Sequence, residues 1–414
     1  MRIYFPSPFR KAAFVGSCAF LSLVMVLLSF REAAAWYVSR DGSVKGYRKA
    51  VRLTSYDAKY HYFLGELSLH EDPAAAKAHL QRTLQLDSGS AEAWLAIADA
   101  EARLHNPTAQ NAAILAALSN APRDIRVQWQ AANLFLVQGE LLKALPLMRE
   151  IVANDPDRRE SVLALMYRLF DGNVDSMMEG IPATAKSQLY LMEWLIGRDH
   201  AALADQVWPS VMGSREKLLW QDTRFYVDSL IARRDIAKAR EVWTVVGRAD
   251  PSVSAKVEPG NLLVNGDFES NLLNAGFDWR VNNQTGINIA VDTSAFHGGT
   301  RSIAIQLDAG SFADAGLYQL VPVKPDTKYV LRGFWHGEEL ESANGLRFAA
   351  IDDDSSTTLA LSDGALGSFP WREASVEFTT GPKTQLVRIT LVRSPETGRI
   401  RGTLWIDEVR LESR

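Results

Sequence analysis

Acidic side chains are the residues of this chain most able to do chemistry, and Glu338 and Glu341 are one example of a carboxylate pair. Two carboxylates that flank a cleft about 5–9 Å apart hydrolyse glycosidic bonds in many enzymes. Acidic residues are abundant, however, and nothing in the sequence singles out this pair. The chain has no P-loop, glycine-rich dinucleotide loop, zinc-type histidine pair or serine elbow. We therefore expect a protein without catalytic activity.

Length and composition indicate a globular protein. The 414 residues are too many for one ordinary core and predict two or three domains. Hydrophobic residues make up 47% and charged residues 23%, so most of the chain should fold. A net charge of −4 gives no general attraction to nucleic acid. Cys18 is the single cysteine, which excludes an internal disulfide and a cysteine-based metal site.

The N-terminal residues carry a targeting signal. Residues 1–11 form a short basic tail before Ala12–Phe30, a run of 19 residues without charge. Such a run is close to the ~20 residues that a helix needs to cross a bilayer. The basic flank predicts a cytoplasmic N-terminus and export of the rest. We expect an uncleaved signal anchor at 12–30 and a juxtamembrane segment at 31–42. A cleaved signal peptide is the alternative, because Ala33 and Ala35 fit a small-residue cleavage site.

Residues 43–250 are predicted to form a helical repeat domain. The turn residues Asp87, Ala121 and Asp155 stand 34 residues apart and separate pairs of amphipathic stretches. One such pair cannot bury its apolar face alone, so the pairs should stack into a solenoid with a concave groove. After Arg159 the pattern loosens, and the number of repeats stays open.

The 34-residue period resembles the tetratricopeptide repeat over about half of the chain. Trp94 and Trp129 stand where that repeat has an aromatic residue early in its first helix. Gly65 matches its small residue. Grooves of stacked helix pairs bind peptides or proteins, so we expect a protein partner here. The tryptophans of the region are expected to pack the core and not to contact that partner.

The chain changes character after residues 251–260, a predicted linker that contains charge, Pro and Gly. Beyond it, alternating apolar runs such as SIAIQL and LVRITLV are separated by turn clusters. The segment NLLVNGDFES, Asn261–Ser270, is predicted to be the opening strand. About ten short strands in 261–414 predict an antiparallel β-sandwich. The expected fold class is therefore multidomain, α followed by β.

The order of these motifs resembles the jelly-roll carbohydrate-binding modules. NLLVNGDFES, HGGTRSIAI, YQLVPVKPDTKYVLRGFW, WREASVEF and GTLWIDEVRL follow in the expected sequence. In that group the first and last strands pair, and a structural Ca²⁺ often lies near them. The resemblance implies that Glu269 and Asp407 supply carboxylates to a Ca²⁺ ion and that carbonyl oxygens near Gly266 complete its cage. The alternative is that Asp267 and Glu269 only cap a turn.

Sugar binding, which the resemblance also implies, needs aromatic rings that stack on pyranose faces, with polar groups nearby. The available aromatic residues are Trp335, Trp371, Trp405 and Tyr318. Trp405 alternates with Leu404 and Ile406 and should face away from whatever those two bury. Trp335 ends a strand before a polar loop suited to the rim of a cleft. Each tryptophan also fits a purely structural role.

Together these features predict an exported, membrane-anchored adaptor with a protein partner at the helical repeats and a glycan at the sandwich. The expected place is the bacterial inner membrane, crossed once, with most of the chain on the periplasmic side. The expected process is the making or export of a cell-envelope or extracellular polysaccharide. Two alternatives stay open, a protein–protein scaffold without sugar affinity and a glycan-active enzyme. We expect no nucleic-acid partner and no cofactor besides the calcium ion.

Overall fold

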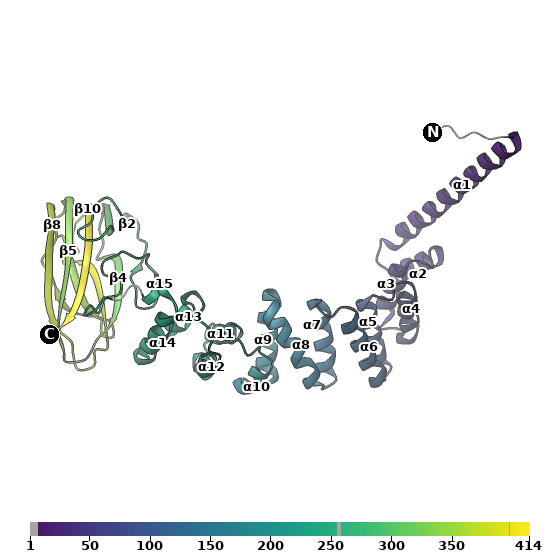
Figure 1. Cartoon of the computed structure of the whole chain (residues 1–414), viewed down its shortest axis with the longest axis horizontal. Helices are drawn as coiled ribbons and strands as arrows, with labels where there is room; N and C mark the ends of the chain where they lie inside the picture. The colour runs from purple at the N-terminus through teal and green to yellow at the C-terminus, as the bar shows by residue number, and fades with distance from the viewer. Residues whose placement is uncertain (1–6, 255–257, 397) are drawn as a thin grey trace. The chain divides into compact units, whose positions relative to one another are not determined.

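The computed structural model describes residues 7–254, 258–396 and 398–414. The chain forms two compact units, Met1–Pro182 and Ala183–Arg414, and Figure 1 shows the elements of each in chain order. The sequence predicted that the repeats and the sandwich separate at the linker 251–260. The boundary between the two compact units follows Pro182, so the last helices group with the sandwich, and the predicted bounds of the repeats and the linker stay a prediction. Residues 255–257 of the predicted linker lie outside the described residues.

The first unit begins with the long helix α1 (Pro8–Ser39), whose N-terminus is capped by the hydroxyl of Ser7. Its most apolar 18-residue window has a mean hydropathy of 2.3, and 0% of that window is buried. The helix is therefore long and apolar enough to cross a membrane, a property that a signal sequence shares. It extends beyond the predicted span at both ends and runs through Ala33 and Ala35 without a break.

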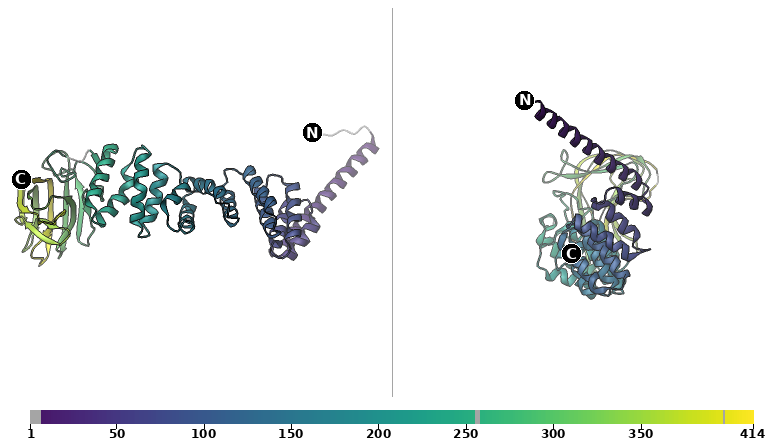
Figure 2. Two further views of the ribbon diagram at one scale, coloured as in Figure 1. Left: turned by 90° about the horizontal axis from the view of Figure 1, so that it is seen from below. Right: turned by 90° about the vertical axis from the view of Figure 1, so that its right-hand side faces the viewer.

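The helices that follow α1 stack as successive hairpins, which Figure 2 shows from two further sides. In the first unit they are α2 (Val44–Leu53), α3 (Ala58–Ser68), α4 (Pro73–Leu86), α5 (Ala91–Arg103), α6 (Pro107–Asn120), α7 (Ile125–Val137), α8 (Leu141–Asn154), α9 (Pro156–Leu169) and α10 (Val174–Glu179). The predicted turn residues Asp87, Ala121 and Asp155 cap the C-terminal ends of α4, α6 and α8, which confirms the helix–turn–helix period.

Local chemistry explains where these hairpins turn. The side chains of Asp72 and Asn106 accept backbone N–H bonds at the starts of α4 and α6, and a proline follows each cap. Proline suits this first helical position because its missing N–H would have no partner there. The small residue Gly65 lets α3 and α4 approach closely, since a Cβ at this position would lie 2.7 Å from Cγ of Leu80.

The second unit starts with further helices. They are α11 (Ala185–Ile196), α12 (Ala201–Gly213), α13 (Trp220–Ala232), α14 (Ile236–Ala249) and α15 (Pro251–Ser254). Trp194, Trp208, Trp220 and Trp243 are between 6% and 8% exposed. The expected packing role of these tryptophans is therefore confirmed.

The β-sandwich follows the helices in the same unit. Its strands are β1 (Arg280–Val281), β2 (Ile287–Asp292), β3 (Ser302–Gly310), β4 (Asp314–Pro322), β5 (Lys328–Glu341), β6 (Leu346–Asp352), β7 (Thr357–Leu361), β8 (Gly367–Thr379), β9 (Leu386–Arg393) and β10 (Ile400–Ser413). Two antiparallel five-stranded sheets, β1-β4-β9-β6-β7 and β2-β3-β10-β5-β8, enclose one core. Both predicted apolar runs, SIAIQL in β3 and LVRITLV in β9, point alternate side chains into that core.

The prediction that Asn261–Ser270 forms the opening strand is wrong. All of these residues are described, and they form an irregular segment beside β10. Its backbone bends at Asn265 and Phe268, whose φ angles are 53° and 54°. The first segment of the sandwich nevertheless lies beside the last strand, as the resemblance implies. Leu262 N–H donates to the Leu411 carbonyl at 2.9 Å, and Val409 N–H donates to the Gly266 carbonyl at 2.8 Å.

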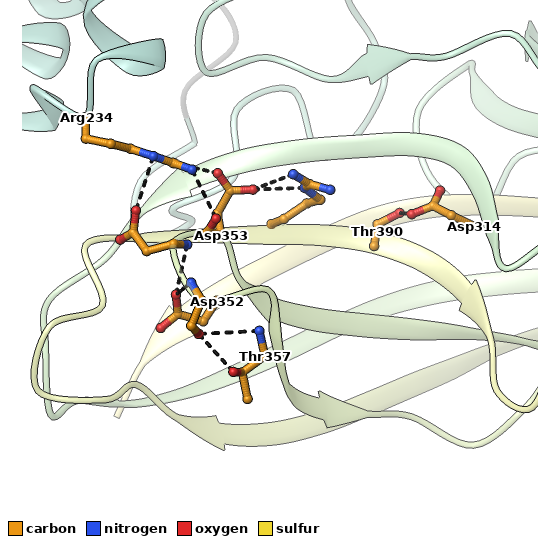
Figure 3. A network of polar contacts seen from close by, with 9 residues as sticks. Arg234, Asp314, Asp352, Asp353, Thr357 and Thr390 are labelled. Atoms are coloured by element: carbon orange, nitrogen blue, oxygen red, sulfur yellow. Dashed lines mark hydrogen bonds and ion pairs between the residues drawn. The ribbon is translucent and has the colours of Figure 1, made fainter.

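A buried aspartate joins the helices of the second unit to the sandwich (Figure 3). Asp353 lies in the turn after β6 and accepts from Arg234, in the α13–α14 turn, at 2.5 Å. Its other oxygen accepts from Arg388 of β9 at 2.6 Å. The neighbouring Asp352 holds the turn itself by accepting from backbone N–H groups of Asp354 and Ser355. The acidic turn after β6 is therefore a docking point for the helices of the second unit.

Replacing Asp353 by Asn should destabilise the second unit. The substitution leaves two guanidinium groups without their shared carboxylate, but both arginines are partly exposed, so we expect a loss of about 1–2 kcal/mol. Urea unfolding of the full chain, followed by tryptophan fluorescence, measures it. Asp354→Asn is the matched control, since Asp354 also contacts Arg234 at 3.2 Å but is 41% exposed. Equal effects of the two substitutions would contradict the assignment of the contact to Asp353.

Candidate functional site

The outer face of the sheet β2-β3-β10-β5-β8 carries the candidate site. Successive side chains of a strand point to opposite faces, and residues paired across two strands point to the same face. Ile406 of β10 pairs with Trp335 of β5, and both lie in the core. The next pair, Trp405 and His336, therefore points outward. This confirms the predicted orientation of Trp405.

Trp335 does not belong to the site, and the expectation that it lines a cleft is wrong. Its side chain is 2% exposed and stacks on Phe348 with ring centres 5.2 Å apart. The physical reason is parity, because Trp335 lies on the same face of β5 as the buried residues Tyr329 and Leu331. A ring in this position has no face free for a sugar.

Tyr318 lies elsewhere in the sandwich. It belongs to β4 in the opposite sheet, where it pairs with Arg280 and Thr390. The guanidinium of Arg388 covers its ring at 5.3 Å from the centre. This is the side of the sandwich on which Arg234 docks, so the structure does not bring Tyr318 together with Trp371 and Trp405.

Trp371, His336 and Trp405 form a row of half-buried rings across three neighbouring strands, β8, β5 and β10. The ring centres of Trp405 and His336 are 5.0 Å apart, at 28° between planes. Those of His336 and Trp371 are 5.7 Å apart, at 36°. Strands are spaced about 4.8 Å apart, so this aromatic row spans about 10 Å. Phe334 lies beside it on β5, with the ring of His297 stacked on it at 3.7 Å.

Hydrogen bonds hold the Trp405 ring in place. The indole N–H donates to Asp292 of β2 at 2.7 Å. Asp292 also accepts from the hydroxyl and backbone N–H of Ser294. These bonds, the Ser294 hydroxyl first and the indole next, lower the pKa of Asp292 to about 2. The carboxylate therefore stays ionised at neutral pH and keeps the indole fixed.

A polar hollow adjoins the aromatic row on the same sheet face. Its volume is about 420 Å³, and Asn288, Gln306 and Thr403 supply hydrogen-bonding groups in its wall. The amide of Asn288 donates to the side-chain oxygen of Gln306 at 3.0 Å, which leaves donors and acceptors on both residues for a ligand. Rings for stacking thus stand next to groups able to bind hydroxyls.

The residues predicted to bind calcium instead fasten a loop. Asp407 is 0% exposed and accepts from the backbone N–H groups of His297 and Gly298 at 2.8 and 2.9 Å. Burial raises its pKa, against the effect of these bonds. Glu269 accepts from the N–H groups of Thr300 and Arg301 at 2.6 and 2.9 Å.

This geometry does not fit a calcium cage. N–H donors point at the carboxylate oxygens that a cation would need, and the Gly266 carbonyl already accepts from Val409. Within the ranges that the structure describes, no three His, Cys, Asp or Glu side chains gather as a metal site. The loop depends on its glycines, because a Cβ at Gly299 would collide with Glu269 and its φ is +64°.

Sequence reasoning missed His336, His297 and Phe334. The position of His336 could have been predicted from the run KYVLRGFWH. Side chains alternate along a strand, so Trp335 lies on the same inner face as Tyr329 and Leu331, and its two neighbours point outward. No signal placed His297 near Phe334, because that contact depends on how the loop between β2 and β3 folds over the sheet.

A second candidate site lies in the first unit, in a groove lined by α3, α5 and α7. Its volume is about 340 Å³. Glu66, Glu92 and Asp99 line it, with Asp99 also paired to Arg103 at 3.4 Å, and no basic residue belongs to its lining. Its apolar walls include Leu95, Leu134 and the 84% exposed Val137. The hydroxyl of Tyr62 donates to Glu66, and burial together with this carboxylate raises the pKa of Tyr62 to about 12.

Comparisons with known proteins give low similarity. No protein-family model matches the chain, and no curated protein does. A solved structure described as "CBM4 structure and function" has 13% identity and a TM-score of 0.29, over 37% of this chain and 99% of that one. The CBM22-1 xylan-binding domain from Paenibacillus barcinonensis Xyn10C has 14% identity and a TM-score of 0.27, over 38% and 97%.

The helical part also has structural neighbours. MamA has 17% identity and a TM-score of 0.26, over 43% of this chain and 89% of that one. At these TM-scores the matches carry no functional conclusion for this chain.

Calcium should leave the stability of this protein unchanged. The amide donors to Asp407 and Glu269 already occupy the oxygens that a hard cation would bind. The measurement is the melting temperature of the full chain with calcium and with a chelator. A higher melting temperature in calcium that disappears in Glu269→Gln, with Glu338→Gln as the exposed control, would overturn this and restore the predicted site.

Proposed function

We propose that this protein is a membrane-anchored adaptor that holds a polysaccharide on the outer face of its β-sandwich and a protein segment in its helical groove. The aromatic row Trp371–His336–Trp405 beside the polar hollow is the observation that carries the proposal. Aromatic faces bind the apolar faces of sugar rings, and amide and hydroxyl groups next to them bind the hydroxyls. Both parts of such a site lie on one open sheet face here.

The packing of the rings limits how a glycan could contact them. The His336 ring stacks on Trp405 with ring centres 5.0 Å apart at 28°, and it lies tilted by 36° beside Trp371, so the rings pack partly on one another. A polysaccharide would contact the ring faces and edges that this packing leaves exposed. The amides of Asn288 and Gln306 would then meet hydroxyls of the sugar that extends beyond Trp405.

The proposal contains no catalysis. Glu341 forms an ion pair with Arg401 at 2.7 Å, and Glu338 lies 3.5 Å from His336 on an open strand end. The main alternative is a protein–protein scaffold whose sandwich has no sugar affinity. Glycan titration separates it from the adaptor proposed here.

Helix α1 is proposed to be an uncleaved anchor in the bacterial inner membrane, with the repeats and the sandwich in the periplasm. Ala35 is 0% exposed and packs in one cluster with Ala50 and Tyr60. Cleavage after Ala35 would therefore cut the helix inside a packed cluster. A periplasmic location would bring the sandwich into contact with glycans of the cell envelope. This location is consistent with a role in making or exporting an envelope or extracellular polysaccharide.

The groove of the first unit favours a basic partner segment with an apolar anchor. Glu66, Glu92 and Asp99 would attract lysine or arginine side chains. The exposed Val137, with Leu95 and Leu134 behind it, offers apolar surface to a large aliphatic or aromatic side chain.

Trp405→Ala should weaken glycan binding. The test is calorimetric titration of the full chain in nanodiscs with soluble xylan, cellohexaose, mixed-linkage glucan and alginate. We expect saturable binding to at least one, and an affinity at least about tenfold weaker in the variant, since a loss of ~1.4 kcal/mol is a factor of ten. Tyr318→Ala, on the opposite sheet, should bind like the parent. Failure of the whole panel to bind a folded protein would favour the scaffold alternative.

Removing the acidic charges of the groove should abolish peptide binding there. The triple variant Glu66→Gln, Glu92→Gln, Asp99→Asn should not bind peptides selected on the parent chain from a random display library. Those peptides should be rich in Lys and Arg with one large apolar residue, and their affinity should fall with salt. A control with equal loss of charge is Glu71→Gln, Glu150→Gln, Asp175→Asn, on exposed positions outside the groove. Acidic selected peptides would refute the charge argument.

A further inference from the structure

Helix α2 carries a one-sided stripe of positive charge directly after the membrane-spanning helix. Lys45, Arg48, Lys49 and Arg52 are all exposed, and their spacing of three, four and seven residues puts them on one helix face. The residues of α2 that are buried, Gly46 and Ala50, lie on the other face. No acidic residue occurs within α2.

The packing of α2 on α1 brings this stripe back toward the hydrocarbon boundary. Figure 1 shows α2 beside the C-terminal end of α1. Arg31, the first residue after the uncharged run, donates from Nε to the carbonyl of Leu53 at 3.1 Å. Ala35 of α1 and Ala50 of α2 share one buried cluster. The two helices are therefore antiparallel, and the C-terminal end of α2 lies level with Arg31.

Helix geometry then places α2 relative to a bilayer. The rise of 1.5 Å per residue puts Ser39 about 12 Å beyond Arg31, and α2 returns over about 15 Å. The headgroup layer on each side of the hydrocarbon core is about 6 Å thick. The last turn of α2 thus lies in this layer, and Lys45 and Arg48 lie within about one Debye length, ~8 Å, of it.

Two aromatic residues of α1 lie about 8 and 9 Å beyond Arg31, just outside the headgroup layer and level with Arg48 of α2. Trp36 and Tyr37 are 60% and 63% exposed although they are large and apolar. They follow the uncharged run of α1 by one to two turns. Tryptophan and tyrosine favour the membrane–water interface, where an apolar ring and a polar group are both satisfied.

We propose that the basic stripe of α2 binds anionic phospholipid headgroups of the leaflet from which α1 emerges. The inference rests on the proposed anchoring by α1. Four cations beside an anionic surface are attracted to it, and the attraction is screened by salt. Because α2 packs on both α1 and α3, this contact would hold the base of the repeat unit against the membrane.

An environment-sensitive dye tests the proposal on the full chain. The dye is attached to Tyr56→Cys, an exposed position just after α2, in a Cys18→Ser background. The chain is placed in nanodiscs of phosphatidylcholine alone or with about 30% phosphatidylglycerol. We expect the dye emission to lie further to the blue with the anionic lipid than with phosphatidylcholine alone, and about 0.5 M NaCl to remove this additional shift.

Charge variants separate the stripe from general electrostatics. The variant Lys45→Gln, Arg48→Gln, Lys49→Gln, Arg52→Gln should lose the shift. The control Arg82→Gln, Arg123→Gln, Arg168→Gln, Arg215→Gln removes equal charge from exposed positions and should keep it. Equal emission in both lipids, or no reversal by salt in the parent chain, would overturn the proposal. Loss of the parent chain from the nanodisc would instead refute anchoring by α1, so the two failures are distinguishable.

Discussion

The pairing of β10 with β5 is the constraint on which the candidate glycan site depends. The two strands are paired over nearly their whole lengths, with register shifts at Arg401/Thr403 and Asp407/Arg410, and the register between these shifts decides the face of each side chain there. With Ile406 opposite Trp335 in the core, Trp405 and His336 must meet outside. A shift of one residue would bury the site rings and expose the core rings.

Acidic residues of the sandwich organise the structure around this sheet by accepting hydrogen bonds. Asp353 joins two arginines from different elements, Asp407 and Glu269 hold the loop after β2, and Asp292 fixes the Trp405 indole. Each carboxylate is satisfied by N–H groups of the chain itself, which is the usual condition for burying such a group. The same bonds are the reason for the prediction that calcium leaves the stability of this protein unchanged.

Much of the fold was predictable because its signals are local. The 34-residue period fixes the turns at Asp87, Ala121 and Asp155, and alternation in β3 and β9 identifies core strands. The site was only half predictable. Two of the predicted residues, Trp371 and Trp405, lie together on the outer sheet face, but the burial of Trp335 depends on strand parity, and the placement of Tyr318 depends on which sheet β4 joins. The docking of Arg234 on Asp353, 119 residues away, leaves no local signal at all.

Fluorine NMR of the full chain labelled with 5-fluorotryptophan tests the central claim most directly. The chain has 11 tryptophans, and those of the core serve as internal standards. On addition of a glycan that binds, the resonances of Trp405 and Trp371 should shift, while those of the buried Trp335 and Trp279 should not. Shifts confined to tryptophans of the helical repeats, or no shift at Trp405 under saturating glycan, would contradict the account.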